Sequence, residues 1–170
     1  MKVSNKTITF GSFNSPFEVG LRNLIILAVA SPENLDLQRL IYYDYLVVHT
    51  SDVGVKDSPP SLHPDTPNRS GEIIVRRKAM QQGLDLMYSK SLLNIVFNEQ
   101  GISYSASELT QPFLDLFDSS YCKTLRRNAL WVTNYFSEYS KEELKNFIEK
   151  NIGNWGGEFM YEALVRSVVE

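Results

Sequence analysis

At 170 residues, the chain is long enough for one domain with a sizeable core. Its net charge of -3 and its pI near 5.5 exclude a protein whose whole surface binds nucleic acid, although local basic patches remain possible. Cys122 is the only cysteine, which rules out an internal disulfide and favours a reducing cytoplasm. Since the longest apolar run is too short to span a bilayer, we expect a cytoplasmic protein with no membrane contact.

The first part of the chain predicts an arm followed by a helix. Residues 7–13 alternate weakly, and Phe10, Phe13 and Phe17 are spaced as in an extended arm, expected at 1–17, that places aromatic rings in a groove. Residues 18–30 are helix formers or aliphatic residues, so we expect a buried helix there.

A second helix is predicted from about Pro32 to His49. The sequence SPE at 31–33 has the pattern of a helix start, with Ser as the cap and Pro in the first helical position. Because this segment is apolar nearly all round, the helix should be central and covered on most sides. A long loop then follows at 51–70, and loops of this length in compact domains are usually functional or ordered by a partner.

Residues 62–107 are the segment around which the rest of the chain is organised. Ser70 can cap a basic helix over about 72–88. Strand patterns at 92–97 and 102–105 flank the turn NEQG at 98–101, which predicts a tight antiparallel hairpin. A helix followed directly by a β-hairpin is the order found at the end of a winged helix-turn-helix unit.

The expected fold is therefore α+β and mostly α. We expect a winged helix-turn-helix (KITE-like) core at 18–107 and a C-terminal helical extension at 108–170. Within that extension, apolar residues recur at helical spacing over 121–139. Ser140 and Glu143 form a capping-box pattern that opens a further helix.

One charged residue on the basic helix lies where the pattern predicts the core. Arg76 projects into the apolar arc, so it should pair with Asp44 of the second helix or with a loop acid such as Asp65. The alternative is that the arginine stem carries the charge to the surface. We expect His63, Asp65 and Asn68 to close the loop through hydrogen bonds from side chain to backbone.

Catalysis is the weak hypothesis for this sequence. His49 and His63 are the only imidazoles, and although Asp65 could poise His63 for proton transfer, a turn-closing role is favoured. His49 ends an apolar helix, where a structural role is the default. The phosphate-binding glycine motifs are absent, and two histidines with one distant cysteine do not form a zinc site. We therefore expect no enzyme activity, no metal and no cofactor.

Nucleic-acid binding has a better case than catalysis. Arg69, Lys78 and Lys90 are possible DNA contacts, because the helix before the wing enters the major groove in winged-helix proteins. This footprint is thin, however, since affinity grows with the number of phosphates neutralised. A free-standing winged-helix transcription regulator remains an alternative function.

Aromatic residues support a docking function. The chain has more Tyr and Phe residues than a small core can readily bury, and Tyr is favoured at protein interfaces. The candidate partner-docking residues are Phe10, Phe13, Phe17, Tyr43, Tyr135 and Tyr139.

Three strings carry a resemblance to a known family: LRNLIILAVASPENLDLQRLIYYDYLVVH at 21–49, SLHPDTPNRSGE at 61–72 and IIVRRKAMQQGLDLM at 73–87. Together with the hairpin, they resemble the middle components of the ABC three-component conflict systems, a group that includes LmuC-like accessory subunits of Lamassu systems. The resemblance covers about 13–136, and its most specific pieces are the LQRL-x3-DY run and the HPDTPNRSGE loop.

The resemblance implies a small non-catalytic winged-helix subunit encoded beside an SMC-like or Rad50-like ABC ATPase and a toxic effector, often a nuclease. Such a subunit would bridge the ATPase to the effector and hold the effector inactive. It would also pass on the signal that foreign DNA has been engaged, so DNA would be contacted through the complex. The implied function is defence against phages or plasmids.

Overall fold

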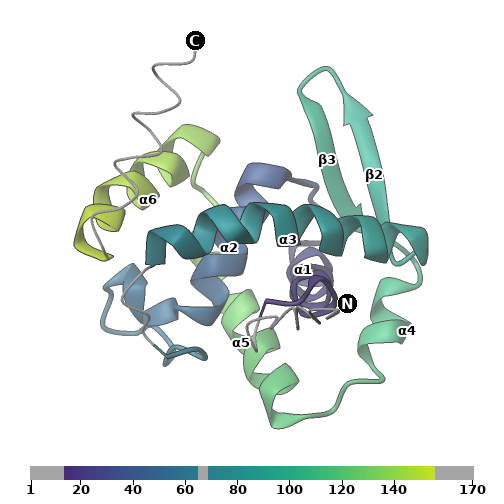
Figure 1. Cartoon of the computed structure of the whole chain (residues 1–170), viewed down its shortest axis with the longest axis horizontal. Helices are drawn as coiled ribbons and strands as arrows, with labels where there is room; N and C mark the ends of the chain where they lie inside the picture. The colour runs from purple at the N-terminus through teal and green to yellow at the C-terminus, as the bar shows by residue number, and fades with distance from the viewer. Residues whose placement is uncertain (1–13, 65–68, 156–170) are drawn as a thin grey trace, which may run out of the picture.

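The structure is a computed structural model that describes residues 14–64 and 69–155 (Figure 1). Its elements are α1 (Pro16–Ala30), β1 (Leu35–Asp36), α2 (Leu37–Val48), the 3-10 helix η1 (Thr50–Val53), α3 (Arg69–Ser89), β2 (Leu93–Asn98), β3 (Gly101–Ala106), α4 (Thr110–Leu114), α5 (Ser120–Tyr135) and α6 (Lys141–Trp155). The expected α+β, mostly helical class is confirmed.

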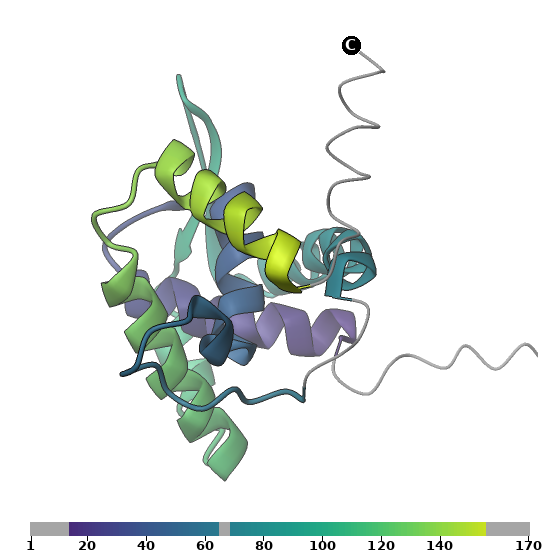
Figure 2. The same ribbon diagram turned by 90° about the vertical axis from the view of Figure 1, so that its left-hand side faces the viewer.

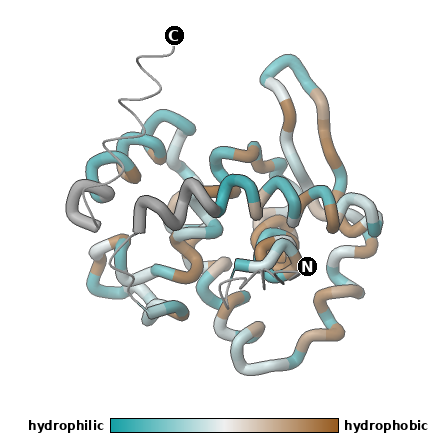
Figure 3. Tube along the Cα trace, in the orientation of Figure 1, coloured by the Kyte–Doolittle hydropathy of each residue, from teal (hydrophilic) through white to brown (hydrophobic). Residues whose placement is uncertain are grey.

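Helix α1 begins earlier than the sequence pattern predicted. Ser15 accepts a hydrogen bond from the backbone N–H of Glu18, and the Glu18 carboxylate accepts one from the backbone N–H of Ser15, which completes a capping box. Pro16 and Phe17 therefore belong to the helix and not to an extended arm; the remainder of that arm, 1–13, lies outside the described residues. The helix lies in the middle of the molecule, where Figure 3 shows it as a largely hydrophobic segment.

The predicted start of the second helix is wrong. Helix α2 begins at Leu37, where Asp36 accepts a hydrogen bond from the backbone N–H of Arg39 at 2.8 Å. Leu35 and Asp36 instead form β1, which pairs with β3. The apolar Leu35 is buried in this sheet position. Asp36 is the N-cap of the helix, a role that the sequence pattern assigned to Ser31.

The sheet has three antiparallel strands in the order β1-β3-β2. The predicted hairpin is confirmed to within one residue at each strand end, with Asn98 opposite Gly101 at its tip. Gly101 has a φ of +114°, a conformation that side-chain-bearing residues rarely adopt, so glycine suits this turn. In Figure 1 the hairpin projects beyond the helices that hold its base.

The C-terminal helices share the core of the N-terminal ones. Helix α5 packs against α1 and α2, and Leu125, Ala129 and Val132 are completely buried in the same cluster as the apolar residues of α1. Helix α6 lies over α2 and buries Leu144 and Ile148 (Figure 2). The expected extension at 108–170 is thus, over its described part, continuous with the core that holds the hairpin.

The described part of the loop predicted at 51–70 is tied to the end of α2. The backbone N–H groups of Leu62 and His63 both donate to the carbonyl of Val48, at 2.9 and 3.0 Å. The loop starts with η1, and α3 begins at Arg69. His63 is therefore held at a fixed place beside the core.

Candidate functional site

A cluster of charged side chains lies inside the helical core. Asp44 of α2 is completely buried, and both of its carboxylate oxygens accept hydrogen bonds from Arg22 of α1. Arg22 Nε lies 2.8 Å from Oδ1, and Nη2 lies 3.1 Å from Oδ2. Arg76 of α3 donates from Nη1 to Asp44 Oδ2 at 2.9 Å and to the Asp44 carbonyl at 3.2 Å. Three helices are thus connected through one carboxylate.

Two guanidinium groups determine the charge state of this carboxylate. Burial alone would raise the pKa of Asp44, but the charges of Arg22 and Arg76 outweigh burial and hold this pKa below its ordinary value. Burial likewise acts to lower the pKa of Arg22, and Asp44 reverses that effect, so the pKa of Arg22 is raised. Each of these two shifts favours the charged form, so the pair of Asp44 and Arg22 is ionised at neutral pH.

An aromatic layer surrounds the cluster. The Arg76 guanidinium lies 5.5 Å from the ring centre of Tyr45, which is within the range of a cation–π contact. The ring of His49 lies 4.8 Å from Tyr45 and 6.1 Å from His63. His63 Nε2 is 2.9 Å from the hydroxyl of Tyr121 on α5. The two histidines are thereby part of the packing between α2, α5 and the loop.

The environment of His63 disfavours its protonated form. Burial first, and then the positive charges of Arg22 and Arg76, lower the pKa of His63 to about 4. A histidine with this pKa is neutral at pH 7 and only weakly basic, which does not suit a general base at that pH.

Arg76 pairs with Asp44, one of the two partners that the sequence analysis considered. The other candidate, Asp65, and the loop residue Asn68 lie outside the described residues. The sequence analysis did not identify Arg22 as part of this cluster. It could have done so, because Arg22 is a charged residue inside an apolar helical run, which is the reason that Arg76 was identified.

The predicted DNA contacts are spread along α3. Lys78 in the middle of the helix and Lys90 just after its end are both exposed, together with Arg77. The side chain of Arg69 lies outside the described part of the helix. Asp85 is also exposed on α3, so the described face of the helix is only weakly basic.

The predicted docking residues differ in how much of each side chain is exposed. Tyr43 is only 2% exposed, with its ring against Phe136, so it offers no docking surface; an aromatic residue on an all-round apolar helix fills the core instead. Tyr139 is half-buried against Phe136 and Phe147. Phe17 and Tyr135 remain exposed. Phe10 and Phe13 lie outside the described residues.

The exposed docking candidates mark two apolar surfaces, one formed by α1 and the segment before α5 and the other by the last residues of α5 itself. The first, the α4-side surface, consists of Phe17, Phe113, Leu116 and Phe117 and precedes the helix; Leu116 is 77% exposed. The second, the α6-side surface, consists of Leu130, Trp131 and Tyr135, where the rings of Trp131 and Tyr135 stack at 5.2 Å.

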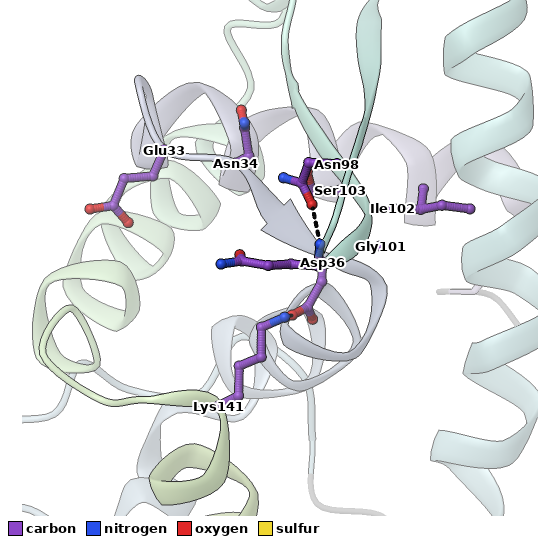
Figure 4. Close-up of a pocket in the computed structure, with 9 residues that line it drawn as sticks. Glu33, Asn34, Asp36, Asn98, Gly101, Ile102, Ser103 and Lys141 are labelled. Atoms are coloured by element: carbon purple, nitrogen blue, oxygen red, sulfur yellow. Dashed lines mark hydrogen bonds and ion pairs between the residues drawn. The ribbon is translucent and has the colours of Figure 1, made fainter.

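A polar hollow of about 350 Å³ lies where the hairpin tip meets β1 and the start of α6 (Figure 4). Asp36 and Lys141, which form an ion pair of 2.8 Å, line this hollow together with Glu33 and Asn98. This ion pair connects the first residue of α6 to the N-cap of α2, so we assign it a structural role.

Within 14–64 and 69–155, no group of three or more His, Cys, Asp or Glu side chains is placed to hold a metal ion. A search of the same residues found no helix with the length and apolar character needed to cross a membrane. The described residues form a helical body with a protruding hairpin and exposed apolar surfaces.

Residues 12–158 match the family described as ABC-three component (ABC-3C) system Middle Component 2. The chain belongs to this family. The match runs from before α1 through α6, so it includes the charge cluster, the hairpin and both apolar surfaces. Searches of curated proteins and of solved structures gave no significant match.

Membership in this family makes the chain one component of a multi-component system, with an accessory role beside the other components. The resemblance at 13–136 therefore extends over α6 as well, which places that helix within the family's common region.

Proposed function

We propose that this middle component is a non-catalytic bridging and regulatory subunit of a cytoplasmic defence complex against phages or plasmids. It connects an SMC-like ABC ATPase to an effector nuclease, as in LmuC-like subunits of Lamassu systems. Support comes from family membership and from the two exposed apolar surfaces. The position of these surfaces toward opposite ends of α5 carries the proposal, because a bridging subunit needs two docking sites that do not overlap.

The two surfaces are separated along α5, one lying before its first residue and the other beginning at Leu130. Helix α5 has 16 residues, and at 1.5 Å per residue it spans about 24 Å. Leu116 lies before the first residue of the helix, and Tyr135 is its last residue. Each surface presents large apolar side chains of the kind that anchor protein interfaces.

The topology supports a winged-helix (KITE-like) core. The order α1-β1-α2-α3-β2-β3, with β1 paired to β3, is that of a winged helix-turn-helix domain. In this arrangement α3 is the helix before the wing. Among the α3 residues whose side chains are described, 76–89, the exposed cations are Arg77 and Lys78, and this small number favours DNA contact through the whole complex over DNA binding by this subunit alone.

The environment of the histidines supports a subunit without catalytic activity. His63 is in contact with Tyr121 and has a pKa near 4, and His49 is completely buried beside Tyr45. Both rings are therefore used in packing the loop and α2 against α5.

Co-purification of the three components tests the proposal. Leu116→Ser with Phe17→Ser alters the α4-side surface, and Leu130→Ser with Tyr135→Ser alters the α6-side surface. We expect each double variant to lose one partner and keep the other, so each serves as the matched control for the other. All four side chains are exposed, so the variants should keep the circular dichroism spectrum of the parent.

Two results would contradict this function. If both double variants retain both partners, the apolar surfaces do not dock the other components. If the isolated chain binds one DNA sequence tightly and specifically, the transcription regulator becomes the better explanation.

A further inference from the structure

Strand β2 forms an open edge of the sheet. The order β1-β3-β2 places it at one side, and within the described residues no other strand pairs with it. In an antiparallel ladder, alternate residues direct their N–H and C=O groups toward the neighbouring strand. Every second residue of β2 (Leu93–Asn98) therefore directs these groups away from β3, on a hairpin that projects from the helical body (Figure 1).

This edge lacks the features that usually protect edges from pairing. Natural edge strands carry charged residues, proline or a bulge. The sequence of β2, LNIVFN, contains no charge and no proline, and its pairing with β3 is continuous from Leu93 to Asn98. Phe97 is 73% exposed, and Ile102, directly opposite it on β3, is 52% exposed. An apolar pair thus lies beside a free row of backbone hydrogen-bonding groups.

The charges at the two ends of the strand indicate which chain can pair with it. Lys90 precedes β2 and Glu99 follows it, and both side chains are exposed. When two copies of β2 pair antiparallel, the Glu99 end of each strand is directed toward the Lys90 end of the other. The chain ends that come near each other therefore carry opposite charges, and the uncharged strands between them do not repel each other.

We propose that β2 is a self-association surface, on which a second copy of this chain pairs its own β2 in the antiparallel sense. Two three-stranded sheets would then form one continuous sheet around a twofold axis. The pairing is closed, because each copy uses its single β2 edge. This dimer does not depend on the proposed bridging function, since neither apolar surface beside α5 takes part in it.

The base of the hairpin limits the extent of the interface. The Thr110 hydroxyl donates a hydrogen bond to the carbonyl of Leu92 at 2.7 Å. This carbonyl, just before β2, therefore already has a hydrogen-bond donor within the chain. Pairing is thus confined to the strand itself, and such an interface buries less area than permanent dimers do. We expect a dimer that dissociates on dilution.

Sedimentation velocity over a concentration series of the full chain tests the dimer. Phe97→Lys places a charge on the edge and should weaken association about tenfold or more. Tyr88→Lys is the matched control, because Tyr88 is also an exposed aromatic residue, at 53%, but lies on α3 and in neither apolar surface; we expect it to dimerise like the parent. Circular dichroism verifies that both variants fold.

Charge reversal separates specific pairing from general stickiness. Lys90→Glu and Glu99→Lys should each weaken the dimer, and the double variant should restore it. A parent chain that remains monomeric at its highest soluble concentration would overturn the proposal. So would a dimer that Phe97→Lys leaves unchanged, a double variant that does not recover, or open assemblies larger than two copies.

Discussion

Gly83 of α3 lies directly against Gly20 of α1, where the two helices cross. A Cβ atom added to Gly83 would lie 2.8 Å from the backbone nitrogen of Gly20 and 2.8 Å from the carbonyl oxygen of Pro16. These neighbours are backbone atoms, so they can move only if α1 itself moves. The close crossing brings Arg76 and Arg22 onto the same carboxylate.

Gly83→Ala should therefore destabilise the protein, although alanine is the better helix former. We expect a loss of about 2 kcal/mol in the free energy of unfolding, measured by urea denaturation. Gln82→Ala is the matched control, because Gln82 is exposed on the same helix and should change stability little. A Gly83→Ala variant as stable as the parent would mean that the helices are not in contact at this position.

Loss of the buried carboxylate should be among the most damaging changes in the chain. Asp44→Asn would leave the guanidinium groups of Arg22 and Arg76 without their countercharge, at a cost of about 3–5 kcal/mol in the free energy of unfolding. The control is Asp118→Asn, because the Asp118–Lys123 ion pair is exposed on both sides and should contribute less than about 1 kcal/mol. Equal losses in the two variants, measured by urea denaturation, would contradict the importance of burial.

Replacing the whole cluster should be less harmful than breaking it. A triple variant with Arg22→Met, Asp44→Leu and Arg76→Met buries no charge at these positions, so it avoids the cost of an unpaired ion. We expect its free energy of unfolding to exceed that of Asp44→Asn alone. A triple variant that loses the sum of the single losses would indicate that each arginine stabilises the fold independently of Asp44.

His63 should make stability depend on pH in the mildly acidic range. The pKa of His63 is lowered from 6.5 to about 4, so between these values the unfolded chain binds a proton that the folded chain does not. Stability should therefore fall as the pH decreases from about 6.5 to about 4, by about 2 kcal/mol after allowance for partial solvation. Urea denaturation at several pH values measures this change.

The His63→Gln variant serves as the control for that pH dependence. It cannot bind the proton, so its stability should change less over the same pH interval. The sign of the effect matters: if the parent were instead more stable at pH 5 than at pH 7, His63 would be stabilised in its charged form, contrary to its position beside Arg22 and Arg76.

DNA binding by the isolated chain should be weak, and its affinity should depend only modestly on salt, because few phosphates are contacted. With Arg77, Lys78 and Lys90 as the exposed cations of this described region, a plot of log affinity against log salt should have a slope of about -3. Fluorescence anisotropy with duplex DNA measures this slope, and Lys78→Ala should reduce it by about one. A slope several times steeper would require a basic surface beyond these three residues.

Local chemistry was sufficient to predict some parts of this fold. The turn at Asn98 to Gly101 and the alternating residues beside it predicted the hairpin, because turn type and strand pairing are set by neighbours in the chain. The capping box at Ser140 and Glu143 likewise predicted the start of α6, and both of its hydrogen bonds are present.

Elements that depend on distant partners were predicted less well. Strand β1 exists because Leu35 and Asp36 pair with β3, about seventy residues later, and no local pattern indicates this pairing. Tyr43 resembled an interface residue in sequence, yet packing against Phe136 buries it. The short α4 leaves Leu116 exposed, which periodicity alone did not indicate.

The sequence by itself determined that Arg76 required a buried counterion or an escape to solvent, because the charge lay on an apolar helical arc. Only the tertiary structure decided between these outcomes and added Arg22 to the same carboxylate. The reason is physical: the free energy of a buried charge depends on which groups lie within a few ångströms of it. Here three helices meet at Asp44, and their crossing brings together residues that lie 22 and 32 positions away from it in the chain.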